Sequence, residues 1–223
     1  DHCYRSHVDD ARQAGMVLAA YHYLRNPSEG TSIRQQVDAS LEVMGGDHRL
    51  PMWLDCETDA GLHPDHIREC KRLFEESGIR VVGVYSYIPW WEGRVVGGEP
   101  DTHEFGAVWL AAYGQNPTGP PRAIYPGDQA DKWNYPLGNQ LPAIWQYGSA
   151  GLVTGREVDI NAFRGSVEQL QALFYSGTVP QGGNSMSLFG HEQVAALNDA
   201  KIAAQEANQK LDRLISLMEY VAG

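Results

Sequence analysis

Short apolar segments alternate with amphipathic helical patterns along much of this 223-residue chain, and this alternation constrains the fold more than any other feature. Strands that alternate with helices indicate βαβ units and a parallel sheet. The pattern therefore predicts an α/β fold with six strands, in which the linking helices are lost toward the end of the series. The predicted strands cover residues 17–24, 50–57, 79–87, 107–113, 141–147 and 157–160.

The predicted helices are bounded by residues that commonly begin or end helices. Ser32 and Gln35 form a capping-box pattern ahead of a segment whose apolar residues recur at helical spacing. Pro64 opens the next helix, where its missing N–H has no cost, and Gly78 ends that helix. Two further helices are predicted at residues 4–14 and 165–175.

An apolar run that begins at Leu50 ends in two carboxylates, Asp55 and Glu57, spaced two residues apart. Residues two apart in a strand point to the same side, so both acids project together from the end of a buried segment. Buried carboxylates are costly unless they are paired, and two carboxyl groups facing one centre suit acid/base cleavage of a glycosidic bond. Alone, the pair fits equally well a strand that simply reaches solvent.

Charge and cysteine content exclude several classes of function. The net charge of −11 argues against binding of nucleic acid through a basic face, and against nonspecific attraction to anionic membranes or wall polymers. Cys3, Cys56 and Cys70 form no CxxC pair, so we expect reduced thiols and no zinc ribbon or disulfide framework. No apolar run approaches the ~20 residues of a membrane span, and no signal peptide is recognised. His63 and His66 flank a helix start without a third ligand nearby, which favours a structural role over a metal site.

Composition divides the chain into three parts. Residues 1–175 carry the alternating pattern, and residues 176–190, rich in Gly and Ser, are predicted to be a linker. Residues 191–223 form a predicted helix with a 3-4 apolar repeat, in which Lys201 and Asn208 occupy core-type positions. Such a repeat is typical of a coiled coil that would make the protein a homo-oligomer. A single helix docked on the main domain is the alternative.

Five short motifs follow one another along the chain: Ala20-Tyr21-His22-Tyr23, Leu54-Asp55-Cys56-Glu57, Gly83-Val84-Tyr85-Ser86, Trp109-Leu110-Ala111-Ala112-Tyr113, and Trp145-Gln146-Tyr147 with Val158-Asp159-Ile160-Asn161. In this order they resemble glycoside hydrolase family 25, the lysozymes of the Chalaropsis type, which include many phage endolysins. The resemblance covers about residues 1–165. Each motif alone is weak, and their order and spacing carry the resemblance.

The resemblance implies a TIM-like (β/α)5β3 barrel, in which helices follow the first five strands and the last three strands are bare. The six predicted strands match the last six of that barrel. The family's first strand, which carries an Asp-x-Ser signature and one active-site acid, has no counterpart here, and neither has its second. We therefore expect a barrel that is N-terminally incomplete in this chain, with an unpaired edge, and a C-terminal helix after it. The missing strands would lie in an upstream segment, or the domain is decayed.

The resemblance also implies which residues carry the chemistry. The glutamate of the Asp-x-Glu pair is the proton donor, which is Glu57 here, and Asp55 would stay ionised and hold that proton or the substrate's acetamido group. Asp159 matches the aspartate of the family's last strand, and capping of the next helix is its alternative role. Substrate contacts are expected from side chains near the other strand ends, which are Tyr21, Tyr23, Tyr85, Trp109, Tyr113, Gln146 and Tyr147. Core packing is the alternative for Tyr21, Tyr85, Tyr113 and Tyr147. His22, Trp53 and Cys56 are expected to face away from the acids and pack.

The activity implied by the resemblance is that of an N-acetylmuramidase, a retaining lysozyme that cleaves the β-1,4 bond after N-acetylmuramic acid in bacterial peptidoglycan without a cofactor or metal. The alternatives are a glycan-binding module without turnover and a chitinase-like enzyme. The nucleophile would be an enzyme carboxylate or the substrate's acetamido oxygen, and the close Asp-x-Glu pair favours the latter. Reduced cysteines fit a phage endolysin made in the host cytoplasm and released by a holin. A tail-associated lysin and a secreted lysozyme are the other locations considered.

Overall fold

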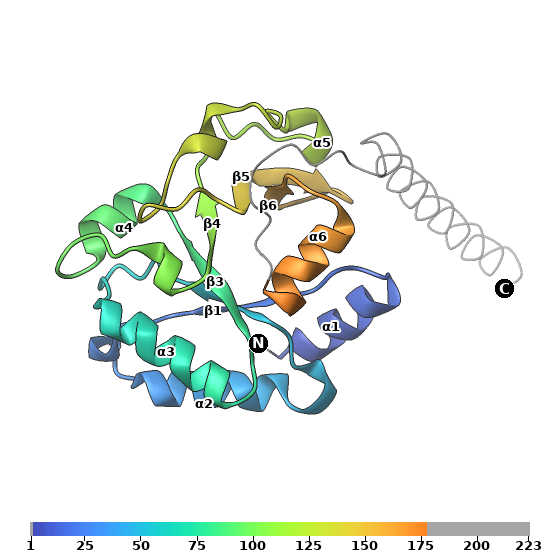
Figure 1. Cartoon of the computed structure of the whole chain (residues 1–223). Coiled ribbons are helices and arrows are strands. Elements are labelled where there is room, and N and C mark those ends of the chain that lie inside the picture. Colours follow the sequence, from blue (N-terminus) through green and yellow to red (C-terminus); the bar gives the residue numbers. More distant parts are fainter. Residues whose placement is uncertain (1, 178–223) are drawn as a thin grey trace, which may run out of the picture. The chain divides into compact units, whose positions relative to one another are not determined.

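The computed structural model describes residues 2–177 of the chain (Figure 1). The chain divides into two compact units, Asp1–Gln181 and Gly182–Gly223. The predicted barrel at residues 1–175 falls in the first unit. The predicted helix at 191–223, with its proposed self-association, and nearly all of the predicted linker at 176–190 lie outside the described residues.

Six strands form one curled sheet in chain order, which confirms the predicted α/β half-barrel. The first five strands run parallel, and the sixth is antiparallel to the fifth. Parallel strands need crossover connections, and helices supply the connections from β1 to β2 and from β2 to β3. The strands are β1 (Ala20–Tyr23), β2 (Met52–Asp55), β3 (Val81–Ser86), β4 (Ala107–Ala111), β5 (Ile144–Val153) and β6 (Arg156–Phe163).

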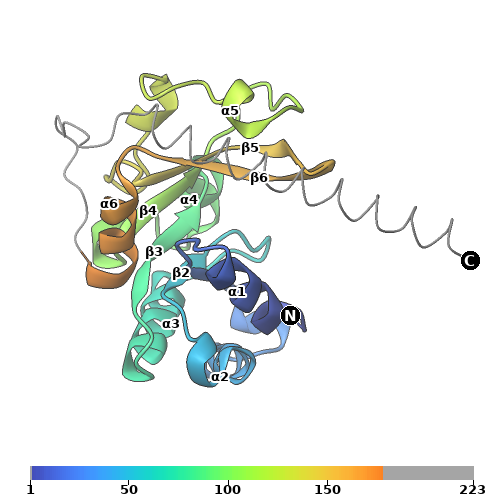
Figure 2. The same ribbon diagram turned by 90° about the vertical axis from the view of Figure 1, so that its right-hand side faces the viewer.

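Two amphipathic helices cover the outer face of β1 to β3 and pack side by side (Figures 1 and 2). They are α2 (Ile33–Met44) and α3 (Pro64–Glu76). The capping box predicted for α2 is confirmed, because the Ser32 hydroxyl accepts the Gln35 N–H at 3.2 Å and the Gln35 side chain accepts the Ser32 N–H at 2.9 Å. The other helices are α1 (Tyr4–Gln13), α4 (Ile88–Arg94), α5 (Pro121–Ile124) and α6 (Val167–Gln171).

Five short helical turns complete the secondary structure of the described residues. The last of them, a π-helical turn, continues α6, so the helix predicted at residues 165–175 is confirmed as two joined pieces. The 3-10 turns η1 and η4 border the site described below. They are η1 (Pro27–Glu29), η2 (Gly46–His48), η3 (Thr102–Glu104), η4 (Asp131–Asn134) and the π-helical turn η5 (Ala172–Ser176).

The inner face of the sheet has its own apolar cluster, which the π-helical turn η5 closes. Leu173 and Phe174 of η5 are buried there, and the Phe174 ring lies 6.3 Å from that of Trp53. Arg80, just before β3, donates to the carbonyl oxygen of Phe174 at 3.0 Å. The segment therefore plugs the half-barrel at the end where the parallel strands begin.

The orientation predicted for Trp53 was wrong. Trp53 lies on the inner face, two residues before Asp55 in the same strand, and residues two apart share a face. Its predicted packing role is confirmed, because it is 1% exposed. Cys56 and His22 do lie on the other side: Cys56 belongs to the outer cluster, and the His22 ring packs edge-on against Phe74 of α3 at 5.3 Å.

The last two strands are longer than the sequence predicted and form a tight hairpin. Thr154 and Gly155 make its turn with φ of 49° and 77°, a left-handed conformation that glycine adopts without strain. Gly151 leaves room for Ile160, since a Cβ at Gly151 would lie 2.1 Å from the Ile160 Cγ2. The hairpin lies at the opposite end of the sheet from α2 and α3 (Figures 1 and 2).

Within residues 2–177 the sheet stays open, because β1 pairs only with β2 and β6 only with β5. This confirms the prediction of an incomplete barrel.

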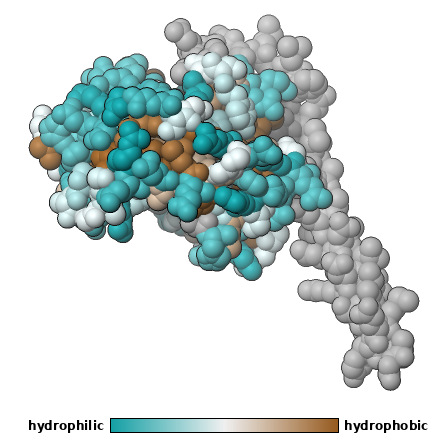
Figure 3. Space-filling view, turned by 90° about the horizontal axis from the view of Figure 1, so that it is seen from below, coloured by the Kyte–Doolittle hydropathy of each residue, from teal (hydrophilic) through white to brown (hydrophobic). Residues whose placement is uncertain are grey.

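Hydrophilic residues cover most of the side of the molecule seen in Figure 3, and hydrophobic residues gather in one limited area of it. In the same part of the chain, no helix is long and apolar enough to cross a membrane.

Candidate active site

The strand register places a row of functional side chains across the sheet. Tyr23 of β1 pairs with Asp55 of β2, Asp55 pairs with Tyr85 of β3, and Tyr85 pairs with Trp109 of β4. Residues in register on neighbouring strands point to the same face. One row thus joins four of the predicted site residues near the carboxyl ends of the parallel strands, where barrel enzymes carry their active sites.

The loop that carries Glu57 is fixed by hydrogen bonds to its backbone. The Ser86 hydroxyl donates to the carbonyl oxygen of Cys56 at 2.6 Å, and the Trp90 indole N–H donates to that of Thr58 at 2.9 Å. The Thr58 hydroxyl donates to the Glu29 carboxylate of η1 at 2.7 Å. Since the residues on both sides of Glu57 are held, its position relative to Asp55 is set in advance of ligand binding.

Asp55 is buried at 6% exposure, and its environment favours the protonated form. Burial, followed by the charge of Glu57, raises the pKa of the Asp55 carboxyl from 3.8 to about 8. Within the described part of the chain, its Oδ1 has no hydrogen-bond partner. The raised pKa favours a protonated Asp55 at neutral pH, in contrast to the ionised carboxylate expected from the sequence, because the described neighbours that exclude water from Asp55 supply no cation that lowers its pKa.

Glu57 is half-buried, and its pKa is raised as well. Desolvation is the larger cause and the negative charge of Asp159, from β6, is the second. Asp159 itself is exposed. A carboxyl group with a raised pKa keeps its proton closer to neutral pH, which is what a general acid requires. The structure thus brings the three predicted acids to one centre.

Gln146 of β5 organises the aromatic side of the site. Its side-chain oxygen accepts hydrogen bonds from the hydroxyls of Tyr85, at 2.7 Å, and Tyr113, at 2.6 Å, while Gln146 itself is 3% exposed. The ring of Trp109 lies 4.9 Å from that of Tyr85 at an interplanar angle of 67°, and its N–H donates to Asn161 at 2.8 Å. These contacts fix the faces of the aromatic rings beside Glu57.

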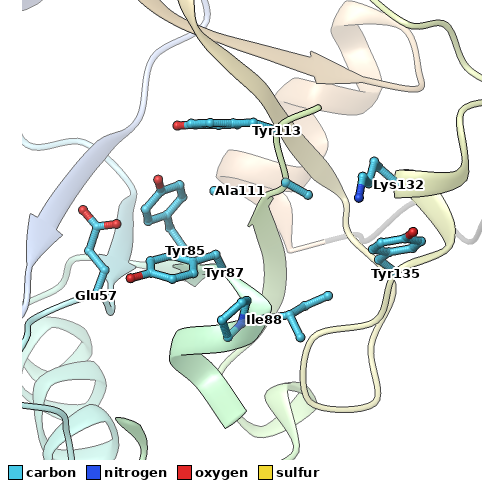
Figure 4. A pocket seen from close by; sticks show the side chains of 10 residues that line it. Glu57, Tyr85, Tyr87, Ile88, Ala111, Tyr113, Lys132 and Tyr135 are labelled. Carbon is cyan, nitrogen blue, oxygen red and sulfur yellow. The ribbon is translucent and has the colours of Figure 1, made fainter. Parts of the chain in front are cut away.

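A pocket of about 630 Å³ opens beside this group, and Glu57, Tyr85 and Tyr113 line it (Figure 4). Ala111 and Ala112, next to Tyr113, line it as well. The remaining walls come from residues that the sequence did not single out as site residues. Three lie at the start of α4 and two in the long connection between β4 and β5: Tyr87, Ile88, Pro89, Lys132 and Tyr135.

The sequence model of the glycosyl hydrolases family 25 matches residues 1–156. The chain belongs to this family. No curated protein matches the chain.

Two solved structures are similar in fold to this chain. A glycosyl hydrolase 25 of Streptococcus pneumoniae, described as a virulence factor participating in host cell invasion, aligns with 74% of the chain at 20% identity and a TM-score of 0.54. The CTP1L endolysin aligns with 78% at 16% identity and a TM-score of 0.53. The chain spans 66% and 55% of the lengths of these two solved chains.

The remaining predicted substrate contacts, Tyr21, Tyr23 and Tyr147, differ in their exposure and in the side chains around them. Tyr23 is 41% exposed on the inner face, and burial together with the charges of Glu57 and Asp55 raises the pKa of its hydroxyl. Tyr21, two residues earlier on the same face, is 66% exposed. Tyr147 is 7% exposed in a separate cluster with Trp133 and Trp145, where its hydroxyl donates to a backbone carbonyl.

The position of Tyr147 does not support its predicted substrate contact. Neighbouring residues of a strand point to opposite faces, so Gln146 and Tyr147 could not both reach the site. The sequence analysis did not identify Lys132 and Tyr135. Nothing in the sequence marks them as site residues, because they belong to a loop whose course only the fold determines. Asn161, by contrast, lies two residues after Asp159 and could have been found from the alternation of β6.

The histidine pair at the start of α3 acts as a cap. His63 Nδ1 accepts the Asp65 N–H at 3.2 Å, and His66 Nδ1 accepts the His63 N–H at 3.3 Å. Both histidines are thus engaged with the free N–H groups of the first helical turn. Residues 2–177 contain no group of three or more His, Cys, Asp or Glu side chains arranged to hold a metal ion.

Proposed function

We propose that this family 25 member is an N-acetylmuramidase, a lysozyme that hydrolyses the β-1,4 bond between N-acetylmuramic acid and N-acetylglucosamine in bacterial peptidoglycan. The observation that carries the proposal is Glu57. Its carboxyl group lines an aromatic pocket, is raised in pKa by burial and by Asp159, and stands beside the buried Asp55. Aromatic walls suit the apolar faces of sugar rings, and an acid of raised pKa suits protonation of a glycosidic oxygen.

In the reaction we infer, Glu57 gives its proton to the oxygen of the leaving sugar. The acetamido oxygen of the cleaved sugar attacks its own anomeric carbon as the glycosidic bond breaks. Glu57, now a carboxylate, takes a proton from the water that opens this cyclic intermediate, and the two inversions together retain the anomeric configuration.

Asp55 has a position suited to assist this route. Its Oδ1 has no hydrogen-bond partner in the described residues, and we propose that a polar group of the substrate supplies one. An acetamido group beside Asp55 would supply that partner and would be held against the anomeric carbon. This favours the acetamido oxygen over an enzyme carboxylate as nucleophile.

Digestion of purified peptidoglycan by the protein and by Glu57→Gln tests the proposal. The amide is nearly isosteric but donates no such proton, and general acid catalysis contributes ~10²–10⁴-fold. We expect the variant to lose at least ~10²-fold in rate, and the native products to end in reducing N-acetylmuramic acid. Glu42→Gln, an exposed acid on α2, is the matched control and should keep full activity.

The products distinguish the alternatives. Reducing N-acetylglucosamine ends would show that the protein is a glycosidase of another specificity and not a muramidase. Cleavage of chitin oligomers at a similar rate would favour a chitinase-like enzyme. Tight binding of glycan without hydrolysis would favour a binding module, which the open sheet makes the second candidate.

For the location, we propose an endolysin made in a host cytoplasm and released by a holin, which fractionation of infected cells would test.

A further inference from the structure

The pocket extends from the acids toward a cation that the proposed reaction does not use. Lys132 lines it together with Tyr135, and the Lys132 ammonium lies 4.3 Å from the centre of the Tyr135 ring. Figure 4 shows Glu57 and Lys132 on opposite sides of the pocket, with Tyr85, Tyr87 and Tyr113 between them. A ligand that fills the pocket therefore meets an acid at one end and a cation at the other.

The turn that presents Lys132 and Tyr135 is firmly anchored. Lys132 belongs to η4, whose Trp133 is 1% exposed and packs edge-on against Trp145 of β5 at 5.5 Å. The Trp133 N–H donates to the Tyr125 hydroxyl at 3.1 Å, and the guanidinium of Arg164 lies 4.4 Å from the Trp133 ring. An anchored turn holds its exposed side chains near one place, which reduces the cost of ordering them around a ligand.

The charge of Lys132 is left for a ligand. Residues 2–177 contain no ion pair between Lys132 and a carboxylate, whereas Lys71 and Arg68 both have such partners. Among the residues that line the pocket, Lys132 is the single cation and Glu57 the single acid. The protein as a whole carries a net charge of −11, so its general field repels anions and the local ammonium is what would attract one.

We propose that Lys132 and Tyr135 form a subsite for a carboxylate borne by the muramic acid unit. This inference rests on the proposed muramidase function and adds to it the feature that separates peptidoglycan from chitin. The carboxylate belongs either to the lactyl group of a muramic acid without peptide or to the peptide stem attached to that group. An ammonium binds either one, and the Tyr135 ring supplies an apolar surface beside it.

Binding to the Glu57→Gln protein tests the subsite without requiring hydrolysis. The ligands are three tetrasaccharides: a peptide-free peptidoglycan fragment, the same fragment with peptide stems, and a chitin fragment without carboxylates. Calorimetry would compare the Glu57→Gln protein with versions that also carry Lys132→Met or Lys132→Arg. Lys71→Met, which removes a cation from the outer face of α3, is the matched control.

We expect Lys132→Met to weaken binding of a carboxylate-bearing ligand about tenfold, a charge-assisted contact of ordinary strength, and Lys132→Arg to restore most of it. A loss with the peptide-free fragment assigns the lactyl carboxylate, and a loss only with stems assigns the peptide. Binding of the chitin fragment should not change.

An equal loss with the chitin fragment, no loss with either peptidoglycan fragment, or no binding of any ligand would overturn the subsite. The hydrolysis assay with the native protein judges the muramidase function separately. Cleavage of peptidoglycan that is unaffected by Lys132→Met at limiting substrate would therefore refute this subsite alone.

Discussion

The charge state of Asp55 gives the sharpest test of the site, because it changes the pH dependence of folding. Its pKa is raised from 3.8 to about 8 in the folded protein, chiefly by burial. Between these values the folded state holds a proton that the unfolded state has released. The contribution of Asp55 to the free energy of unfolding is therefore fully present below pH 3.8 and falls as the pH rises toward 8.

The magnitude follows from the width of that interval. Each pH unit between the two pKa values costs about 1.4 kcal/mol of stability, so this group alone should lower the free energy of unfolding by about 4 kcal/mol between pH 4 and pH 7. Asp55→Asn replaces the protonated acid by a neutral amide of similar shape. The difference in stability between variant and native protein should then grow by about 4 kcal/mol over this range, in favour of the variant.

Urea unfolding followed by tryptophan fluorescence measures this difference at pH 4, 5.5 and 7. All six tryptophans lie within residues 53–145, so the signal reports on the half-barrel. Asp59→Asn, an exposed acid four residues further on, is the matched control and should follow the native protein at every pH. If the Asp55→Asn difference is constant within about 1 kcal/mol, Asp55 is ionised at neutral pH and the burial argument fails.

Two further perturbations test the site and the plug of the half-barrel. Asp159→Asn removes a charge that raises the pKa of Glu57, so the alkaline limb of kcat/KM should move to lower pH; a limb that stays in place would separate Asp159 from Glu57. Phe174→Ala should lower the free energy of unfolding by about 3–5 kcal/mol, because it opens a cavity beside Trp53, whereas the exposed Val167→Ala should cost little. Urea unfolding checks this pair, and equal effects would mean that η5 does not close the inner face.

Much of the fold follows from local sequence patterns. The capping box at Ser32 and the glycine after α3 act over a few residues, so their effect can be read without knowing the rest of the chain. The apolar strands fix which segments are buried, and their alternation with helices dictates a parallel arrangement. For the same reason Asp55 and Glu57 could be recognised at the end of a buried segment before any contact was known.

Other features depend on contacts between residues distant in sequence. The length of the β5–β6 hairpin depends on Gly151 accepting Ile160, and the plug depends on Phe174 reaching Trp53. The protonation of Asp55 depends on how completely its neighbours exclude water. Lys132 enters the pocket only because Trp133 anchors its turn on β5.

The sequence by itself therefore determined that strands and helices alternate, where the helices after Ser32 and His63 begin, and that Asp55 and Glu57 end a buried segment, because short-range spacing and capping encode these features. Only the tertiary structure decided the charge on Asp55, the separation of Gln146 from Tyr147 and the arrival of Lys132 and Tyr135 beside Tyr113. The physical reason is that desolvation and electrostatic interaction depend on the atoms that surround a group in space. Those atoms come from segments far apart in the chain, as with Trp53 and Phe174, and only folding brings them together.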